Sequence, residues 1–193
     1  MEKINQIKSS GIPLPIEHID TDQIIPARFL KSTSKEGFGE NLFRDWRYNN
    51  AELNTDFVLN DPKFKGSILV AGHNFGCGSS REHAAWAIHD YGFRAVVSSE
   101  FADIFKGNAM NNGLLPIEVS TDYLQALTTA IYNNPETQIE IDLQSQTIAF
   151  EGEVYNFEID GFKKQCLLDG KVEFDYLVEM HDAIEAYENN RSF

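Results

Sequence analysis

The middle of the chain alternates short, strand-like apolar runs with longer segments in which apolar residues recur at helical spacing. The apolar runs have strand length and are bounded by glycine or polar residues, a pattern typical of buried strands. The predicted strands are 67–72, 94–99 and 114–119, and the predicted helices are 80–91, 100–113 and 121–133. Strands that alternate with helices indicate a mostly parallel sheet with helices packed on it, and hence an α/β fold.

Two of these predicted helices carry residues that favour helix ends. Gly92 directly follows the apolar stripe of residues 80–91, and a glycine in the left-handed conformation commonly ends a helix. Ser120 or Thr121 stands at the start of the third helix, where its hydroxyl can accept a hydrogen bond from the first turn. We therefore expect helix boundaries at these residues.

The N-terminal quarter is less regular. Residues 4–15 mix apolar and polar residues as a strand does, and Pro26 blocks a long helix in the segment that follows. Residues 31–40 are polar with two glycines, which predicts a loop, and residues 41–48 predict a short helix. We expect the loop over 28–45 to be mobile, because it has few apolar anchors, and to close over a bound ligand.

The C-terminal third follows a different pattern from the middle. Residues 137–159 alternate apolar and polar side chains with a period of two, which predicts two or three antiparallel strands. Helices are predicted at 162–168 and 176–190. In the second helix an apolar stripe is expected to face the core; its residues are Leu177, Met180, Ile184 and Tyr187.

The composition indicates one cytoplasmic domain over residues 1–193. The chain is 42% apolar and long enough to bury a core without disulfides. No apolar run approaches the roughly 20 residues of a membrane span, and the first residues lack the apolar core of a signal peptide. The net charge of −14 disfavours binding to nucleic acid or to an anionic membrane. An anionic ligand would therefore need local cations and backbone N–H groups.

The strongest candidate for chemistry is the stretch "GHNFGCGSSREHAAWAIHDYG", from Gly72 to Gly92. A strand, a glycine-rich turn and a helix bring backbone N–H groups together at the positive end of the helix, where an anion binds well. The residues expected to make a carboxylate or phosphate site are the glycines Gly72, Gly76 and Gly78, the serines Ser79 and Ser80 at the helix mouth, and the two-pronged donor Arg81.

The residues alone leave simpler interpretations open. Ser79 or Ser80 can serve only as the helix N-cap, and Arg81 can form an ordinary surface ion pair. His83 and His89 fit packing or hydrogen-bonding roles as well as that of a base. The P-loop, the dinucleotide-binding glycine pattern and the nucleophile elbow of serine hydrolases are all absent here. Local chemistry thus favours an anion site without selecting the reactive residue.

The cysteine count limits metal chemistry. Cys77 and Cys166 are the two cysteines, and we expect both to be free thiols. An iron–sulfur cluster needs three or four thiolates, more than this chain carries. A zinc site built from Cys77 with nearby histidines is disfavoured by the same count. We therefore expect no metal ligand in this chain.

The run "NFGCGSSREHAAWAIHDYGFRAVVSSEFADIF" resembles the family of 3-isopropylmalate dehydratase small subunits in the aconitase superfamily. The segment "GSSREHAA" is similar to the signature of the aconitase C-terminal swivelling domain. The resemblance implies an aconitase-type swivelling β/β/α domain, with a mostly parallel central sheet and an antiparallel segment. Further matching blocks, in order along the chain, are 19–30, 37–48, 101–117 and 181–188.

For function, the resemblance implies one half of a hydro-lyase of leucine biosynthesis. In this family 2-isopropylmalate loses water to give isopropylmaleate, and water returns to give 3-isopropylmalate. The family's 4Fe–4S cluster belongs to a large subunit, where it binds the leaving hydroxyl as a Lewis acid. The resemblance therefore implies that this chain binds a small dicarboxylate, needs that iron–sulfur partner, and has essentially no activity alone.

The resemblance also assigns roles to individual residues. Ser79 matches the catalytic serine that removes a proton from the carbon next to a carboxylate, and helix-mouth N–H groups with Arg81 would stabilise its alkoxide. Ser80 and Arg81 match substrate-binding positions. Asp22 matches an acidic residue of the site wall and is expected to orient Arg81 or another site group. Substrate contacts are also implied, around the branched side chain, at Arg28, Phe29 and Leu30.

Phe29 departs from the pattern of many relatives, which carry tyrosine at this position, because phenylalanine lacks the hydroxyl. Three alternatives remain beside the main hypothesis. The chain could serve a related hydro-lyase acting on methylmalate and citraconate or on homoaconitate, or be a non-catalytic anion-binding module. A serine hydrolase using Ser79 with His83 or His89 is weaker, because no third member is evident.

Overall fold

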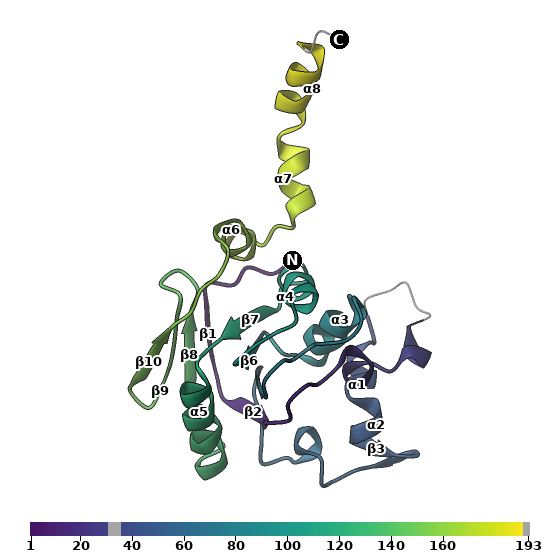
Figure 1. Cartoon of the computed structure of the whole chain (residues 1–193), viewed down its shortest axis with the longest axis vertical. Coiled ribbons are helices and arrows are strands. Elements are labelled where there is room, and N and C mark those ends of the chain that lie inside the picture. Colours follow the sequence, from purple (N-terminus) through teal and green to yellow (C-terminus); the bar gives the residue numbers. More distant parts are fainter. Residues whose placement is uncertain (31–35, 191–193) are drawn as a thin grey trace.

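The central layer of the protein is a four-stranded parallel sheet with helices on both sides (Figure 1). In the computed structural model, which describes residues 1–30 and 36–190, the strand order is β2-β5-β6-β7. Every residue of β5 and β6 is buried, which is why these strands are continuous apolar runs in the sequence. The strands are β2 (Gly11–Leu14), β5 (Ile68–Ala71), β6 (Ala95–Ser98) and β7 (Leu115–Glu118).

The helices of the middle region follow the predicted alternation. They are α3 (His83–Tyr91), α4 (Asp103–Asn111) and α5 (Thr121–Asn133). α3 ends at Gly92, which is left-handed at φ 116°, and the Ser120 side chain accepts a hydrogen bond from the N–H of Tyr123 at 3.2 Å. Figure 1 shows α3 and α4 on one side of the sheet and α5 on the other. The predicted α/β fold and both predicted helix boundaries are confirmed.

A second, antiparallel sheet has the strand order β1-β8-β9-β10. Its strands are β1 (Gln6–Ser9), β8 (Ile139–Asp142), β9 (Thr147–Phe150) and β10 (Glu153–Asn156). The antiparallel segment predicted over 137–159 is therefore confirmed. The single strand expected over 4–15 is wrong, because the chain forms two strands there: β1 pairs with β8 and β2 pairs with β5.

The segment between β2 and β5 consists of short elements. α1 stops at Ile24, just before Pro26, as the proline dictates. The short helix predicted over 41–48 is present. The elements are α1 (Thr21–Ile24), three 3-10 turns (Ala27–Phe29, Gly39–Asn41 and Val58–Asn60), α2 (Arg44–Arg47), and the hairpin strands β3 (Tyr48–Asn49) and β4 (Glu52–Leu53).

The loop over 28–45 has more apolar anchors than its composition suggested. Residues 31–35 lie outside the described residues, so the predicted mobility stays a prediction. In the remainder, Phe38, Leu42 and Phe43 are each at most 3% exposed and belong to the main core. The reason given for mobility, a shortage of apolar anchors, is therefore wrong for residues 36–45.

The C-terminal helices differ most from the prediction. α6 (Gly161–Asp169) packs on the body, whereas α7 (Glu173–Glu179) and α8 (His181–Asn189) project from it as an arm (Figure 1). The apolar stripe expected to face the core is wrong, because the arm has no core beside it. The exposed fractions are 55% for Leu177, 56% for Met180, 39% for Ile184 and 66% for Tyr187.

Across the described residues, no helix is long and apolar enough to cross a membrane.

Candidate active site

The glycine-rich loop after β5 is joined to the segment before α1 by backbone hydrogen bonds. The N–H of Gly76 donates to the carbonyl of Ile19 at 2.8 Å, and the N–H of Thr21 donates to the carbonyl of Cys77 at 3.0 Å. The N–H of Ser79 donates to the buried hydroxyl of Thr21 at 3.2 Å. This pairing brings together two sequence blocks that lie more than fifty residues apart.

Asp22 and Arg81 form an ion pair where these two blocks meet. The Arg81 side chain is 23% exposed and that of Asp22 is 55% exposed, so the guanidinium is mostly buried while the carboxylate faces solvent. A guanidinium has five N–H donors, and one carboxylate does not occupy all of them. Arg81 is therefore held in place by Asp22 and retains donors for a second anion.

Ser79 and Ser80 lie before α3 rather than at its mouth. α3 begins at His83, and its N-cap is Glu82, which makes no side-chain capping bond. The expected position of both serines at the helix mouth is therefore wrong, and so is the simpler interpretation that one of them is the N-cap. Thr21 holds the Ser79 N–H, and the carbonyl of Ser80 accepts from the side chain of Asn108 on α4 at 3.3 Å. These contacts keep both serines in the irregular segment before α3, with exposed side chains.

Sequence reasoning did not anticipate the two residues that hold this segment. Thr21 precedes Asp22 in "IDTDQ", and its side chain is 2% exposed. Asn108 lies in "FKGNAMNN" on α4, whereas the serines precede α3. The family-like blocks containing both residues were the available signal, but their contacts depend on tertiary structure.

Gly72 and Gly76 are explained by packing within the protein. A Cβ atom on Gly72 would lie 2.8 Å from the backbone nitrogen of Glu17. One on Gly76 would lie 2.6 Å from Cβ and 2.8 Å from Cδ1 of Phe105. Close packing therefore accounts for both glycines, without the ligand that was expected to approach them. Gly78 is exposed, and a Cβ there would meet nothing closer than 3.4 Å.

Arg28, Phe29 and Leu30 belong to a neighbouring group of contacts. The Arg28 guanidinium pairs with both carboxylate oxygens of Asp45 and lies 4.7 Å from the centre of the Phe29 ring. The Asp45 carboxylate raises the pKa of Arg28, and the same hydrogen bonds lower the pKa of Asp45. Phe29 and Leu30 are half-buried against the core. Arg28 is thus engaged with Asp45, whereas Arg81 is engaged with Asp22.

The thiols and histidines near the loop have structural surroundings. Burial is the main cause that raises the pKa of Cys77, so its thiol stays protonated at neutral pH. The His83 ring packs against Trp86 and Phe38, and His89 Nε2 lies 2.9 Å from Arg94 Nη1. These arrangements give the serine-hydrolase alternative no support.

Cys166 lies buried on α6, far along the chain from the loop, and burial likewise raises its pKa. Both cysteines are free thiols, as predicted. Within residues 1–30 and 36–190, no three His, Cys, Asp or Glu side chains come together as a set of metal ligands. The donor set that the structure describes therefore does not fit an iron–sulfur cluster.

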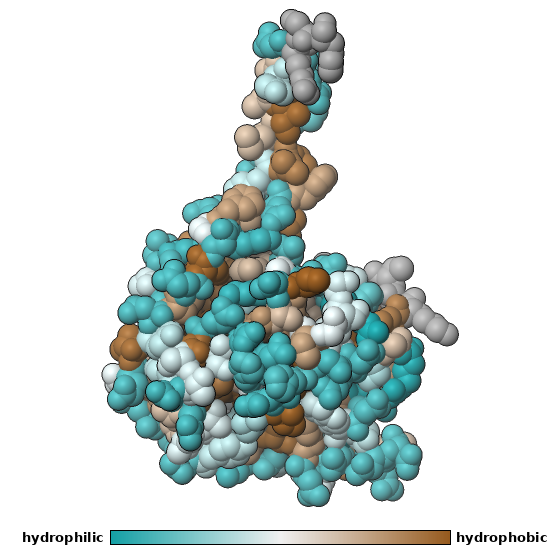
Figure 2. Space-filling view, in the orientation of Figure 1, coloured by the Kyte–Doolittle hydropathy of each residue, from teal (hydrophilic) through white to brown (hydrophobic). Residues whose placement is uncertain are grey.

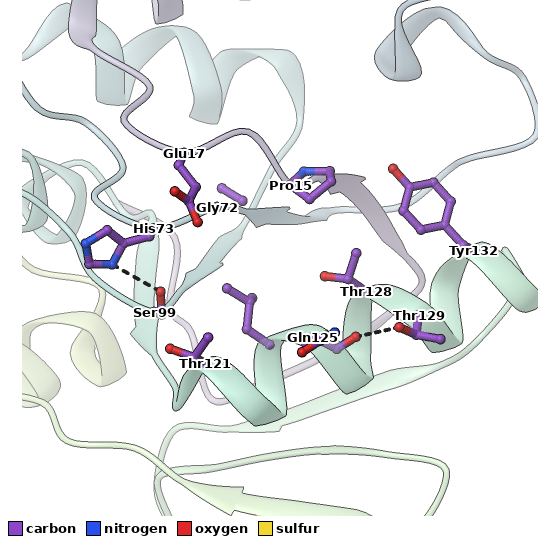
Figure 3. Close-up of a pocket in the computed structure, with 12 residues that line it drawn as sticks. Pro15, Glu17, Gly72, His73, Ser99, Thr121, Gln125, Thr128, Thr129 and Tyr132 are labelled. Atoms are coloured by element: carbon purple, nitrogen blue, oxygen red, sulfur yellow. Dashed lines mark hydrogen bonds between the residues drawn. The ribbon is translucent and has the colours of Figure 1, made fainter.

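A cavity of about 460 Å³ opens beside the start of the loop (Figure 3). Gly72 and His73 form one part of its wall, and α5 forms the opposite wall. His73 lies 3.1 Å from Glu100 through Nε2 and 3.4 Å from the Ser99 hydroxyl through Nδ1. Of the residues predicted to make the anion site, Gly72 lines this cavity, whereas Ser79, Ser80 and Arg81 do not. The loop around Ser79 therefore forms an open surface separate from it.

Comparisons with known proteins agree with this architecture. A family model described as the aconitase C-terminal domain matches residues 1–122, and one described as LeuD_N matches residues 125–161. The solved structure of a 3-isopropylmalate dehydratase (leuD) from Methanocaldococcus jannaschii is 30% identical with a TM-score of 0.68. The match covers 95% of this chain and 99% of that one.

Curated relatives are similar over nearly their whole length. A 3-isopropylmalate dehydratase small subunit from Christiangramia forsetii is 58% identical, over 99% of this chain and 95% of the relative. Small subunits of the same description from Cytophaga hutchinsonii and Karelsulcia muelleri are 55% and 51% identical. Both matches cover all of this chain, with 98% and 100% of the relatives.

Proposed function

The chain belongs to the family of 3-isopropylmalate dehydratase small subunits, hydro-lyases with the aconitase C-terminal domain, and from that premise we propose its reaction. Together with a large subunit, it interconverts 2-isopropylmalate and 3-isopropylmalate through isopropylmaleate in leucine biosynthesis. In each direction one C–H and one C–O bond break as water leaves, and both form again at exchanged carbons as water returns. This chain supplies the group that moves the proton and part of the carboxylate clamp.

Ser79 is the proposed base. Its side chain is exposed, and its N–H is fixed by Thr21, so the hydroxyl is presented to solvent from a held backbone. A serine hydroxyl is a weak acid, so its alkoxide needs a positive neighbour. Arg81 follows two residues later and provides that charge. The proton taken from the carbon beside a carboxylate rests on the Ser79 oxygen until it returns.

Ser80 and Arg81 are the proposed carboxylate clamp, with Asp22 as the residue that positions Arg81. An arginine fork binds a carboxylate through two parallel hydrogen bonds. The observation that carries the proposal is the Asp22–Arg81 pair beside the exposed serines, formed by two blocks that resemble the same family. Arg28, Phe29 and Leu30 are proposed to contact the branched end of the substrate.

The partner and the cluster are the remaining parts of the proposal. The relatives are named small subunits, which implies a large one. Because the described cysteines and carboxylates of this chain do not fit a 4Fe–4S cluster, we assign that cluster to the large subunit. The chain alone is then expected to be inactive.

The test is reconstitution. The purified chain is mixed with its cluster-loaded large subunit, and formation of isopropylmaleate is followed by the absorbance of its conjugated double bond. Ser79→Ala should assemble normally but lower kcat by about 10²–10⁴-fold, the usual contribution of a general base. Ser145→Ala, an exposed turn serine on the antiparallel sheet, is the matched control and should leave kcat unchanged.

Three outcomes would contradict the proposal. No activity in the mixture refutes the enzyme and leaves a non-catalytic anion-binding module. A loss below about tenfold in Ser79→Ala refutes the assignment of the base. A panel of substituted malates decides the substrate: preference for citraconate or homoaconitate would move the chain to a related hydro-lyase.

A further inference from the structure

The arm, defined as α7 and α8, carries large apolar side chains that no part of this chain covers among the residues described. They recur at spacings of one to four residues along both helices, and Figure 2 shows hydrophobic (brown) atoms on the surface of the projecting arm. Each is between 39% and 68% exposed. The residues are Phe174, Leu177, Val178, Met180, Ile184 and Tyr187.

The base of the arm, in contrast, is fixed to the body by specific contacts. The Tyr176 hydroxyl donates to Asp169 at 2.7 Å, and its ring lies 5.3 Å from that of Phe162. Lys171 donates to Glu179 at 2.6 Å, and Lys163 pairs with Glu173. Tyr176 thus faces the body while the neighbouring apolar side chains face solvent, so the arm is presented outward.

The exposed apolar surface is large enough for an interface. An aromatic side chain covers roughly 150–250 Å² and an aliphatic one somewhat less, so the six together present about 600 Å². That matches the largest apolar patch of typical monomers, roughly 300–600 Å², which is often a functional surface. A standard interface buries about 800 Å² on each partner. The arm can therefore supply most of one side.

The charge of the arm selects the kind of partner. Between Glu173 and Asn190 the chain has six Asp or Glu residues and no Lys or Arg. Lys163 and Lys171 pair with two of these carboxylates. In two arms packed together the other four would bring like charges close to one another, which disfavours a second copy of this chain. A partner with an apolar groove and basic residues at its rim complements both the stripe and the charge.

We propose that the arm docks into an apolar groove with a basic rim on the large subunit. This inference rests on the proposed function for the identity of the partner. The stripe, which no described part of this chain covers, then becomes the core of the interface between subunits. Asp182, Glu185 and Glu188 lie at the edge and set the orientation and the salt dependence of binding.

The experiment measures the Kd between the full chain and the purified large subunit by biolayer interferometry at several salt concentrations. Leu177→Ser combined with Tyr187→Ser should weaken binding at least tenfold. Val154→Ser, which changes a residue 62% exposed on β10, is the matched control and should leave Kd unchanged. Asp182→Asn with Glu185→Gln and Glu188→Gln should weaken binding and flatten its salt dependence.

The outcomes separate this inference from the proposed function. If the wild-type mixture turns over substrate and the Leu177 and Tyr187 variant keeps wild-type Kd, the docking inference fails and the function stands. If the wild type binds through the arm but shows no turnover, the function fails and the docking stands. Self-association of the chain that is lost in this variant, with unchanged large-subunit binding, would also overturn the inference.

Discussion

Replacing Gly76 with alanine is the sharpest test of how the loop that carries Ser79 is held. Gly76 lies at φ +77°, a conformation that side-chain-bearing residues rarely adopt. An added methyl would also lie 2.6 Å from Cβ of Phe105, an atom close to the backbone of α4. Phe105 is 2% exposed and has little space to move. The substitution therefore combines backbone strain with a steric clash.

The expected cost is the sum of these two effects. Left-handed backbone costs a non-glycine residue about 1–2 kcal/mol. Overpacking a tight site costs about 1–3 kcal/mol. The total for Gly76→Ala is about 2–5 kcal/mol of unfolding free energy, a large share of the roughly 5–15 kcal/mol of a typical domain. Gly78→Ala is the matched control: φ is +91°, but the nearest atom is 3.4 Å away, so only the strain of about 1–2 kcal/mol applies.

Urea unfolding followed by tryptophan fluorescence measures both variants, with thermal melting as a second readout. If Gly76→Ala and Gly78→Ala differ by less than about 0.5 kcal/mol, Phe105 gives way freely and the packing argument is refuted. Gly76→Ala should also lower the activity of the reconstituted enzyme at a temperature where the variant is still folded. Full activity would show that the position of the loop does not depend on Phe105.

Three further predictions concern groups with shifted pKa values. Burial raises the pKa of Tyr123, whose hydroxyl donates to the carbonyl of Ile148 at 2.9 Å. Above about pH 10 the tyrosine ionises in the unfolded chain but not in the folded one, so the free energy of unfolding should fall as pH rises further. Tyr123→Phe should cost about 0.5–1.5 kcal/mol in urea titrations at neutral pH and remove this alkaline loss. The raised pKa of Cys77 predicts that a disulfide reagent at neutral pH modifies it more slowly than free cysteine, and equal rates would contradict the burial argument. Hydrogen bonds from Gln165 and Tyr176 lower the pKa of Asp169. The contact at the base of the arm should therefore hold above the ordinary pKa of 3.8 and weaken as pH falls below it. Hydrogen-exchange protection in α7 that does not fall in acid, after correction for the intrinsic exchange rate, would refute this.

Local patterns were sufficient for the middle of the fold. The run 67–72 predicts β5 and the segment 121–133 predicts α5, because burial of both strand faces and the apolar face of a helix leave signals within the element itself. Residues 4–15 gave no such information about pairing. Whether β1 joins β2 or β8 depends on a partner more than 120 residues away, which no local period encodes.

The candidate site could be located from the sequence, but the contacts that hold its residues could not be predicted. The glycine-rich turn and the "DTD" block identified Ser79, Arg81 and Asp22 as chemistry-bearing residues. The start of α3 was misplaced by about one turn, since serine is a strong N-cap signal. The contacts from Thr21 and Asn108 that hold the serines outside the helix are tertiary, and they outweigh that local preference.

The stripe on the arm shows a different limit of sequence patterns. Leu177, Met180, Ile184 and Tyr187 have the spacing of a core-facing helix, and the helices are there. Amphipathic spacing indicates that one face of a helix is apolar, but it does not indicate whether this chain or another one buries that face. In the structure that face stays exposed. The helical spacing was therefore predicted correctly, but the burial of that face in the core was not.

The split between β1 and β2 has a consequence for how the chain folds during synthesis. Only Ser10 separates the two strands, yet they belong to different sheets. The parallel sheet is complete once β7 has left the ribosome, whereas β1 must wait for β8, which follows more than twenty residues later. β1 is thus among the first strands to be synthesised and among the last to pair. Until β8 is available, the unpaired edge of β1 can bind chaperones or misassemble.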